Sequence, residues 1–244
     1  MMDIRIFQGA DNWIQGITED FIQAMAAVPA SRPPRLCLAG GQTPEPVYRV
    51  LSQRMVAGRI GRIPAILVPG DERVPGGEQG STGNPSYLNE TMLKRSFAQA
   101  LAAGVAVLYS WFDETARWPA GGSGFDLAQS MIQTMEARLR SLAAPDQALF
   151  DLCYLGLGAD GHTAGLFPGM PGLTDQSLCV RGLAPMPPTQ RVSLGFPALL
   201  SSRRTRFLIS AKGKEDALAR LQAGDASCPA VMAATTDTVA FVLA

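Results

Sequence analysis

The chain of 244 residues contains very little histidine and few cysteines. His162 is the single histidine, and the four cysteines are far apart and form no C-x-x-C pair: Cys37, Cys153, Cys179 and Cys228. Zinc and similar metals are usually held by clusters of histidine and cysteine, so we expect no metal site. Dispersed cysteines are typical of reduced, mostly buried thiols, which predicts a cytoplasmic protein.

The sequence also lacks an excess of charge of either sign and lacks long hydrophobic runs. Its formal net charge is zero and its isoelectric point is near 6.6, so no basic field is available to hold nucleic acid. No apolar run approaches the roughly 18 residues that a membrane span requires, and residues 1–9 do not resemble a signal peptide. The absence of G-x-S-x-G disfavours a serine esterase. We therefore expect a small-molecule partner, with no nucleic acid and no membrane.

Hydrophobic residues make up 47% of the chain, which is ample for the core of one α/β domain. Apolar residues at helical spacing alternate with short apolar runs that are typical of strands. Strands are expected at 35–39, 64–69, 105–109, 150–157, 191–194, 205–210 and 239–243, and near Val231. Helices are expected at 11–28, from 44 onward, at 84–103, 125–142 and 215–222, with a short turn at 197–200. This alternation predicts a single domain, residues 1–244, with an open, mainly parallel sheet flanked by helices.

Two segments are expected to lack regular structure. Residues 169–188 contain several prolines and read as a loop, because proline cannot donate a backbone hydrogen bond to a strand ladder. Residues 76–83 are rich in glycine and are interpreted as a mobile lid.

The most informative stretch runs from Phe150 to Pro168. Its apolar first half predicts a buried strand, and the glycines that follow indicate a sharp turn. Asp160 and His162 lie on that turn. Histidine titrates near neutral pH and suits proton transfer, which favours a catalytic role over a histidine that only caps a helix or fills a polar gap.

The same stretch contains G-x-G-x-x-G, from Gly156 to Gly161, which can mark a dinucleotide site. That motif requires a helix directly afterwards and an acidic residue at the end of a second strand. Here Pro168 and Pro171 follow, and Asp175 falls in a polar, loop-like segment. We therefore reject a dinucleotide site.

Three further segments place polar groups at predicted strand ends. Ala39 to Pro44 joins a strand to a helix, with Thr43 expected as the N-cap and Pro44 as the first helical residue. Such a turn either binds an anion or is simply tight. Arg73 follows another strand and can hold a phosphate in a two-pronged hydrogen bond, and Lys214 follows a third. Since parallel strands bring these ends to one sheet edge, their convergence favours a phosphate site.

These segments, in this order, resemble the 6-phosphogluconolactonase family, within the wider group that includes glucosamine-6-phosphate deaminases. The family patterns S-G-G-S-T-P, D-E-R-x-V-P, G-x-G-x-D-G-H-T-A-S-L-F-P, R-I-T-L-T and G-x-x-K resemble residues 39–44, 71–75, 156–168, 191–194 and 211–214. A further S-N followed by L-L resembles residues 83–84 and 92–93. The chain departs from the family at Gln42, Gly83, Gly165 and Ala211, and one residue is deleted before Val74.

The resemblance implies a Rossmann-like fold and hydrolysis of 6-phospho-D-glucono-1,5-lactone to 6-phospho-D-gluconate without a cofactor, the second step of the oxidative pentose phosphate pathway. In this interpretation His162 is the general base, Asp160 orients it, and Asp71 has a supporting role. Backbone N–H groups between Gly158 and Gly161 would stabilise the oxyanion. The 6-phosphate would be held by Gly40, Gly41, Gln42, Thr43, Arg73 and Lys214.

Two alternatives remain from the sequence. A glucosamine-6-phosphate deaminase would be expected to carry a tyrosine after the Asp-Glu pair, where this chain has Arg73. A non-catalytic sugar-phosphate-binding protein would usually carry a DNA-binding extension, and the presence of His162 argues against it. The sequence does not distinguish a monomer from a small homo-oligomer.

Overall fold

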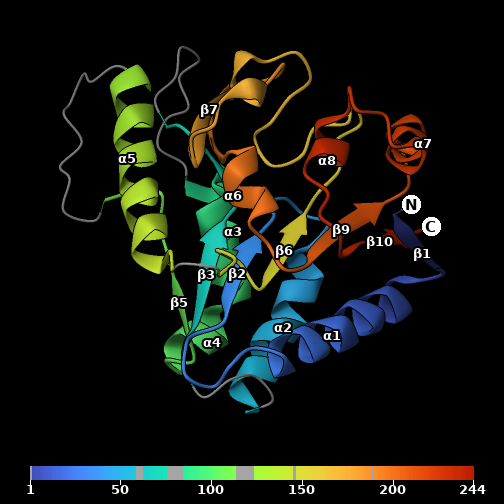
Figure 1. The fold of residues 1–244 in the computed structure, drawn as a ribbon. Coiled ribbons are helices and arrows are strands. Elements are labelled where there is room, and N and C mark those ends of the chain that lie inside the picture. The colour runs from blue at the N-terminus through green and yellow to red at the C-terminus, as the bar shows by residue number, and fades with distance from the viewer. Residues whose placement is uncertain (1, 59–62, 76–84, 114–123, 145–146, 188) are drawn as a thin grey trace.

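A computed structural model describes residues 2–58, 63–75, 85–113, 124–144, 147–187 and 189–244 (Figure 1). Within these residues a seven-stranded sheet forms the centre of the fold, and every neighbouring pair of its strands is parallel. The strands lie in the order β1 (Asp3–Phe7), β10 (Thr238–Leu243), β9 (Thr205–Ser210), β6 (Leu152–Leu155), β2 (Arg35–Leu38), β3 (Ala65–Pro69) and β5 (Ala106–Leu108). The predicted open, parallel α/β sheet is confirmed.

Helices cover both faces of this sheet, and each face has its own apolar core. One core takes side chains from α1 (Ala10–Ala26), α2 (Glu45–Val56), α3 (Asn89–Ser96) and α4 (Ala98–Ala102). The other takes them from α5 (Gly124–Leu142), α6 (Phe196–Leu200), α7 (Glu215–Ala223) and α8 (Pro229–Met232). Successive strand residues alternate between the two cores, so that Leu36 and Leu38 face the first and Cys37 the second. This two-sided burial explains why the strands are almost continuously apolar.

A second, antiparallel sheet packs beside α5 and contains β4 (Asp71–Arg73), β8 (Gln190–Leu194) and β7 (Cys179–Leu183). The strand predicted at 191–194 is confirmed, whereas the prediction that 169–188 is entirely a loop is wrong, because β7 lies within it. The five residues of β7 all pair with β8, so partners later in the chain stabilise this strand. A 3-10 turn, η2 (Pro171–Thr174), precedes it.

Several local predictions need correction. Val231 lies in α8, since Pro229 presets the helical backbone at the first turn. The predicted helix 84–103 is divided into a 3-10 turn, η1 (Pro85–Tyr87), then α3 and α4. Pro44, not Thr43, is the N-cap of α2, and no side chain caps that helix. The edge strand β1 was not predicted. The expected lid at 76–83 and the pair Gly83-Asn84 lie outside the described residues.

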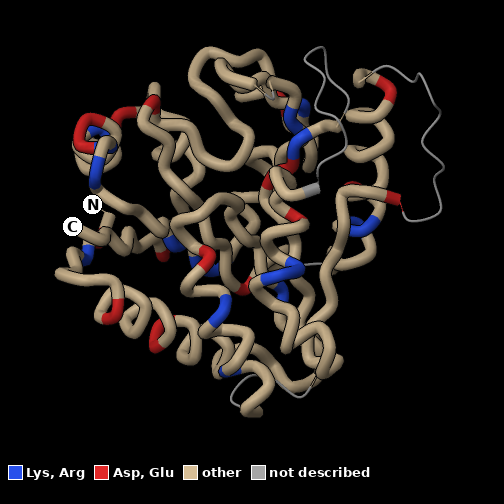
Figure 2. The backbone as a smooth tube through the Cα atoms, turned by 180° about the vertical axis from the view of Figure 1, so that it is seen from behind, with Lys and Arg blue, Asp and Glu red and all other residues tan. Residues whose placement is uncertain are grey.

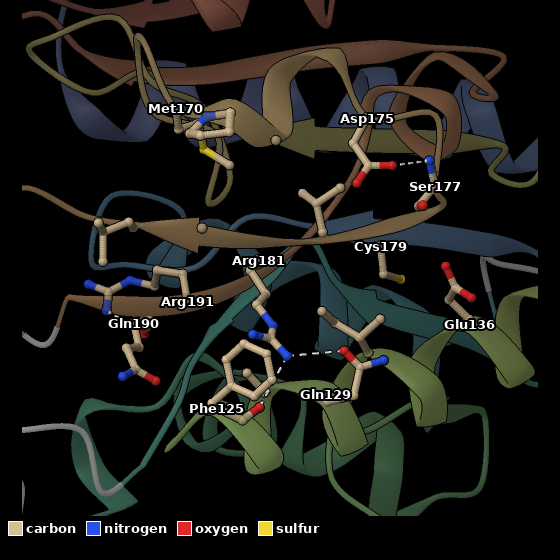
Figure 3. Close-up of a pocket in the computed structure, with 17 residues that line it drawn as sticks. Phe125, Gln129, Glu136, Met170, Asp175, Ser177, Cys179, Arg181, Gln190 and Arg191 are labelled. Carbon is tan, nitrogen blue, oxygen red and sulfur yellow. Dashed lines mark hydrogen bonds between the residues drawn. The ribbon is translucent and has the colours of Figure 1, made fainter. Parts of the chain in front are cut away.

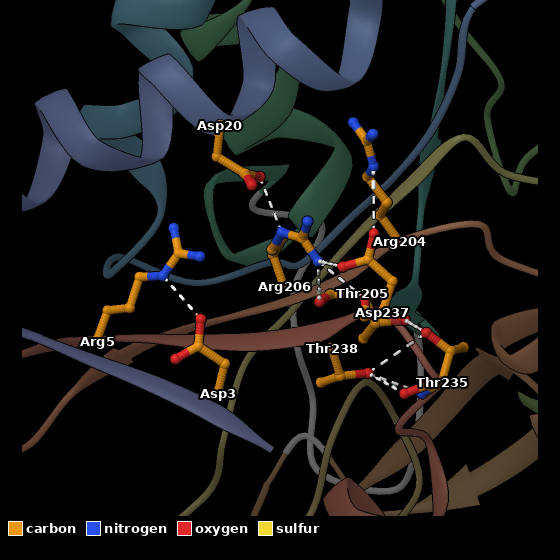
Figure 4. Close-up of polar contacts among 9 residues, drawn as sticks. All are labelled: Asp3, Arg5, Asp20, Arg204, Thr205, Arg206, Thr235, Asp237 and Thr238. Carbon is orange, nitrogen blue, oxygen red and sulfur yellow. Dashed lines mark hydrogen bonds and ion pairs between the residues drawn. The ribbon is translucent and has the colours of Figure 1, made fainter. Parts of the chain in front are cut away.

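Polar side chains join α1 to the amino ends of β9 and β10 (Figure 4). Arg206, whose side chain is 5% exposed, forms ion pairs with Asp20 of α1 at 2.8 Å and with Asp237 at 2.9 Å. Thr235 and Thr238 hydrogen-bond to each other beside it. A buried guanidinium is tolerated only when it is paired in this way, so this cluster fixes α1 against the sheet.

Charged residues elsewhere are distributed over both ends of the fold, and positions of opposite sign often lie close together (Figure 2). Glu45 at the start of α2, for example, pairs with Arg49 and Arg95. Within the described ranges, none of the helices combines the length and apolarity that crossing a bilayer would require.

Candidate active site

A cavity of about 340 Å³ opens at the carboxyl edge of the central sheet. Its lining residues lie on β9, directly after β6 and β2, and on β4, which follows β3; β9, β6, β2 and β3 are consecutive neighbours in the sheet. The chain runs outward in one direction from β2 and in the other from β6, so the cavity lies at the point where the strand order reverses. It is lined by Ala39, Gly40, Gly41, Gln42, Thr43, Pro44, Asp71, Arg73, Asn89, Gly156, Leu157, Gly158, His162, Ala164, Leu208 and Lys214.

The structure brings most of the predicted site residues to this cavity. The predicted residues in its lining are Gly40, Gly41, Gln42, Thr43, Asp71, Arg73, Gly158, His162 and Lys214. The other two, Asp160 and Gly161, lie on the His162 turn but not in the cavity wall. Asn89 from α3 also lines the cavity and was not identified from the sequence.

His162 and Asp160 form a closely held pair. Nδ1 of the histidine lies 2.6 Å from Oδ1 of the aspartate, which also accepts the backbone N–H of His162 at 3.0 Å. Partial burial opposes the charged form of Asp160, but these contacts outweigh it and the pKa of the carboxyl is lowered. An ionised Asp160 fixes the proton of the neutral ring on Nδ1, which leaves Nε2 able to accept one. The ring also packs against Phe167, with ring centres 4.4 Å apart.

The turn that carries this pair is rigid because its own backbone groups are hydrogen-bonded. The N–H of Gly158 donates to the carbonyl of His162 at 2.8 Å, and the N–H of Gly161 donates to that of Gly158 at 3.0 Å. The N–H groups of Gly158 and Gly161 are therefore used inside the turn, and the oxyanion role expected of the turn's backbone stays a prediction. Arg220 donates to the carbonyl of Asp160, and Cys228 to that of Gly161, so α7 and α8 support the turn from outside.

Residues 40–43, which line the same cavity, offer donors that suit an anion. In the described chain, the backbone N–H groups of residues 40–43 have no hydrogen-bond acceptor. They lie just before α2, whose dipole favours negative charge at that end. Gly41 has φ of 89°, a conformation that favours glycine. Behind this loop, the Tyr48 hydroxyl donates to the carbonyl of Ala39 and holds the end of β2.

Two cations face the same cavity. Among the described residues, neither Arg73 nor Lys214 forms an ion pair with a carboxylate. Burial lowers the pKa of the Lys214 ammonium. Burial raises the pKa of Asp71, and the nearby Arg73, Arg191 and His162 partly offset that effect. The cavity lining therefore combines His162, which Asp160 holds from behind the wall, with two cations and unpaired N–H groups.

One departure from the family pattern has a structural explanation. The backbone N–H of Gly165 donates to the Ser193 hydroxyl at 3.0 Å, and a Cβ at this position would lie 2.9 Å from the Cβ of Ser193. A serine in place of Gly165 would therefore collide with Ser193 of β8.

A second, larger cavity of about 720 Å³ lies between α5 and β7 (Figure 3). Arg181 crosses it, with its guanidinium 3.3 Å from the Phe125 ring centre and a hydrogen bond to Gln129. Its lining includes neither His162 nor the residues of the 40–43 loop. The candidate active site is therefore the smaller cavity.

A family model and several curated relatives match this chain, and all of them name 6-phosphogluconolactonase. A family model described as "Glucosamine-6-phosphate isomerases/6-phosphogluconolactonase" matches residues 8–241. The 6-phosphogluconolactonase of Rattus norvegicus is 41% identical over 87 residues, 34% of this chain and 34% of that protein. The 6-phosphogluconolactonase of Mycobacterium tuberculosis is 35% identical over 102 residues, 41% of each chain. The aligned part thus spans well under half the length of these curated relatives.

Solved structures share the fold. The 6-phosphogluconolactonase of Thermotoga maritima has a TM-score of 0.73 at 24% identity, covering 99% of this chain and 100% of that chain. A monomeric glucosamine-6-phosphate deaminase has a TM-score of 0.72 at 20% identity, covering 99% and 97%. At this identity the structural likeness establishes the fold alone.

Proposed function

We propose a function from one premise: the chain belongs to the family of glucosamine-6-phosphate isomerases and 6-phosphogluconolactonases. Within that family, the proposed activity is hydrolysis of 6-phospho-D-glucono-1,5-lactone to 6-phospho-D-gluconate, a step of the oxidative pentose phosphate pathway. The observation that carries this proposal is that His162, paired with Asp160, lines the same cavity as the unpaired N–H groups of residues 40–43.

The reaction needs a base, a water molecule and an already activated ester. Nε2 of His162 takes a proton from water as its oxygen attacks the C1 carbonyl. The tetrahedral intermediate collapses with cleavage of the bond between C1 and the ring oxygen, and the protonated imidazole returns the proton to that oxygen. Such acid–base assistance contributes about 10²–10⁴-fold. A lactone requires no covalent enzyme intermediate and no cofactor for this step.

The phosphate serves to orient the substrate. In the proposal it lies against the N–H groups of Gly40, Gly41, Gln42 and Thr43 and pairs with Arg73 and Lys214. Fixing the phosphate places C1, at the other end of the sugar, beside His162 and converts binding energy into orientation. Asp71 is proposed to have a supporting role and not to act as the base.

The first test compares hydrolysis of freshly made 6-phosphogluconolactone by the purified protein with the spontaneous rate, and with hydrolysis of the unphosphorylated lactone. We expect acceleration for the phosphorylated lactone only. A folded His162→Ala variant should lose at least tenfold in kcat, because the general base is removed. Near-normal turnover of that variant would contradict the mechanism.

The same preparation tests the related activity. The deaminase alternative predicts ammonia release from glucosamine 6-phosphate, whereas we expect none. A non-catalytic binding protein would bind the sugar phosphate and accelerate neither reaction. We further propose a cytoplasmic location, supported by four free, buried cysteines, and a single domain, supported by a central sheet that takes strands from both ends of the chain. The oligomeric state, monomer or small homo-oligomer, remains a prediction.

A further inference from the structure

Asn89, the first residue of α3, lies between Asp71 and Arg73. We propose that it is a positioning residue that keeps these two charges from pairing, and so leaves the Arg73 guanidinium available for the substrate phosphate. The inference rests on the proposed function, because it assigns Arg73 to the phosphate.

All polar groups of the Asn89 side chain form hydrogen bonds with Asp71 or Arg73. Its amide nitrogen donates to the backbone carbonyl of Asp71 at 2.9 Å and to Oδ1 of the same residue at 3.0 Å. Its carbonyl oxygen accepts a hydrogen bond from Nη1 of Arg73. An amide offers two N–H donors and one carbonyl, so each group of Asn89 already has a partner. With 2% of its surface exposed, it acts on its neighbours more than on the substrate.

Without this amide, a direct ion pair would be favoured. Asp71 and Arg73 are two residues apart on β4, and alternate residues of a strand point to the same side. A carboxylate and a guanidinium on one side of a short strand form a strong, often bidentate pair. That pair would occupy the donors of Arg73 and cancel its charge. In the structure Arg73 uses Nη1 for Asn89 and for the carbonyl of Tyr87, and forms no carboxylate ion pair with the described residues.

Gly40 provides independent support for this arrangement. A Cβ on Gly40 would lie 1.9 Å from Oδ1 of Asn89, far inside contact distance. Its φ lies outside the left-handed region, so the backbone does not by itself require glycine there. Gly40 therefore makes room for the Asn89 side chain. The position of the loop of residues 40–43 and that of the Asn89 amide depend on each other.

Binding of 6-phosphogluconate measured by calorimetry tests the inference without requiring turnover. Asn89→Ala should weaken binding about tenfold, because Arg73 turns to Asp71, whereas the much weaker binding of unphosphorylated gluconate should not change. The control compares the binding of 6-phosphogluconate by the single variant Asp71→Asn with its binding by the double variant that also carries Asn89→Ala. Once the carboxylate is absent, removing Asn89 should cost less than about threefold. Equal costs in both backgrounds, or no loss in Asn89→Ala, would overturn the inference.

Gly40→Ala provides a second route to the same result. It should weaken binding about tenfold in the wild-type background by displacing Asn89, and have little further effect in Asn89→Ala. Additive losses would overturn the coupling. Circular dichroism should show intact folding, since the backbone N–H groups that fix α3 remain in Asn89→Ala. Tight phosphosugar binding without lactone hydrolysis would remove the proposed function only, whereas wild-type binding that ignores the phosphate would overturn this inference.

Discussion

Glycine in the His162 turn is required by side chains that lie against it. A Cβ on Gly158 would lie 2.0 Å from Nδ1 of His162 and 2.7 Å from Oδ1 of Asp160. On Gly161, which has φ of 89°, a Cβ would lie 2.7 Å from the sulfur of Cys228. Both glycines were predicted to contact substrate. The structure adds a steric reason for both glycines: Gly158 leaves room for His162 and Asp160, and Gly161 leaves room for Cys228, while their contact with substrate stays a prediction.

Gly158→Ala should therefore reproduce the loss of the general base. The added methyl group displaces the imidazole from Asp160, so we expect kcat for 6-phosphogluconolactone to fall at least tenfold. Gly70→Ala is the matched control, because a Cβ there makes only an ordinary 3.4 Å contact with Cys37, and its turnover should remain near that of wild type. Full activity in a folded Gly158→Ala variant would show that the pair does not control the rate.

The connection between β4 and α3 depends on one buried carboxylate. Glu72 is fully buried and accepts the backbone N–H groups of Arg73 and Asn89 at 2.8 Å and of Glu90 at 2.7 Å. Burial raises its pKa from the ordinary 4.5 to about 7, although these N–H groups oppose the shift. The Glu72 carboxylate binds the backbone N–H groups of both Asn89 and Arg73. Its ionisation is therefore coupled to the positions of these two residues.

The sign of the stability effect follows from that shift. Between pH 4.5 and about 7 the folded chain keeps a proton that the unfolded chain has released. The stabilisation is complete below pH 4.5 and is lost as pH rises toward 7, by at most about 1.4 kcal/mol per pH unit. We expect the free energy of unfolding of wild type, relative to Glu72→Gln, to decrease over this interval. Urea unfolding from pH 5 to 8 measures it, and parallel pH curves for the two proteins would contradict it.

The elements predicted correctly are those whose signal is local. Buried strands such as β2, β3 and β9 are short apolar runs, and α5 has a clear helical period. The strand β7 has no such signal, because it is specified by pairing with β8. Likewise, the spacing around Asp160 and His162 pointed to the site, but nothing around Asn89 did. Its role depends on contacts with Gly40 and β4, which lie 16 to 49 residues earlier in the chain and meet it only in the folded protein.

The site as a whole joins segments that are distant in sequence. Its lining runs from Ala39 to Lys214 and draws on β9, on β4, on α3 and on the loops that follow β2, β6 and β9. A ligand that bridges these segments binds the folded chain and not the unfolded one. The free energy of binding therefore adds to the stability of the entire fold.

This coupling predicts a thermal shift. At about 100 times its Kd, 6-phosphogluconate should stabilise the fold by about 2.7 kcal/mol. For a chain of this size that corresponds to a rise in Tm of roughly 5–10 °C. Gluconate at the same concentration lacks the phosphate that Arg73, Lys214 and the 40–43 loop would hold, so it should leave Tm nearly unchanged. At a fixed concentration of 6-phosphogluconate, Arg73→Ala should show a smaller rise in Tm than wild type, because the variant is expected to bind this ligand with a higher Kd. An equal shift with gluconate would show that the binding energy comes from contacts with the sugar and not with the phosphate. It would contradict the proposed phosphate-binding role of Arg73, Lys214 and residues 40–43.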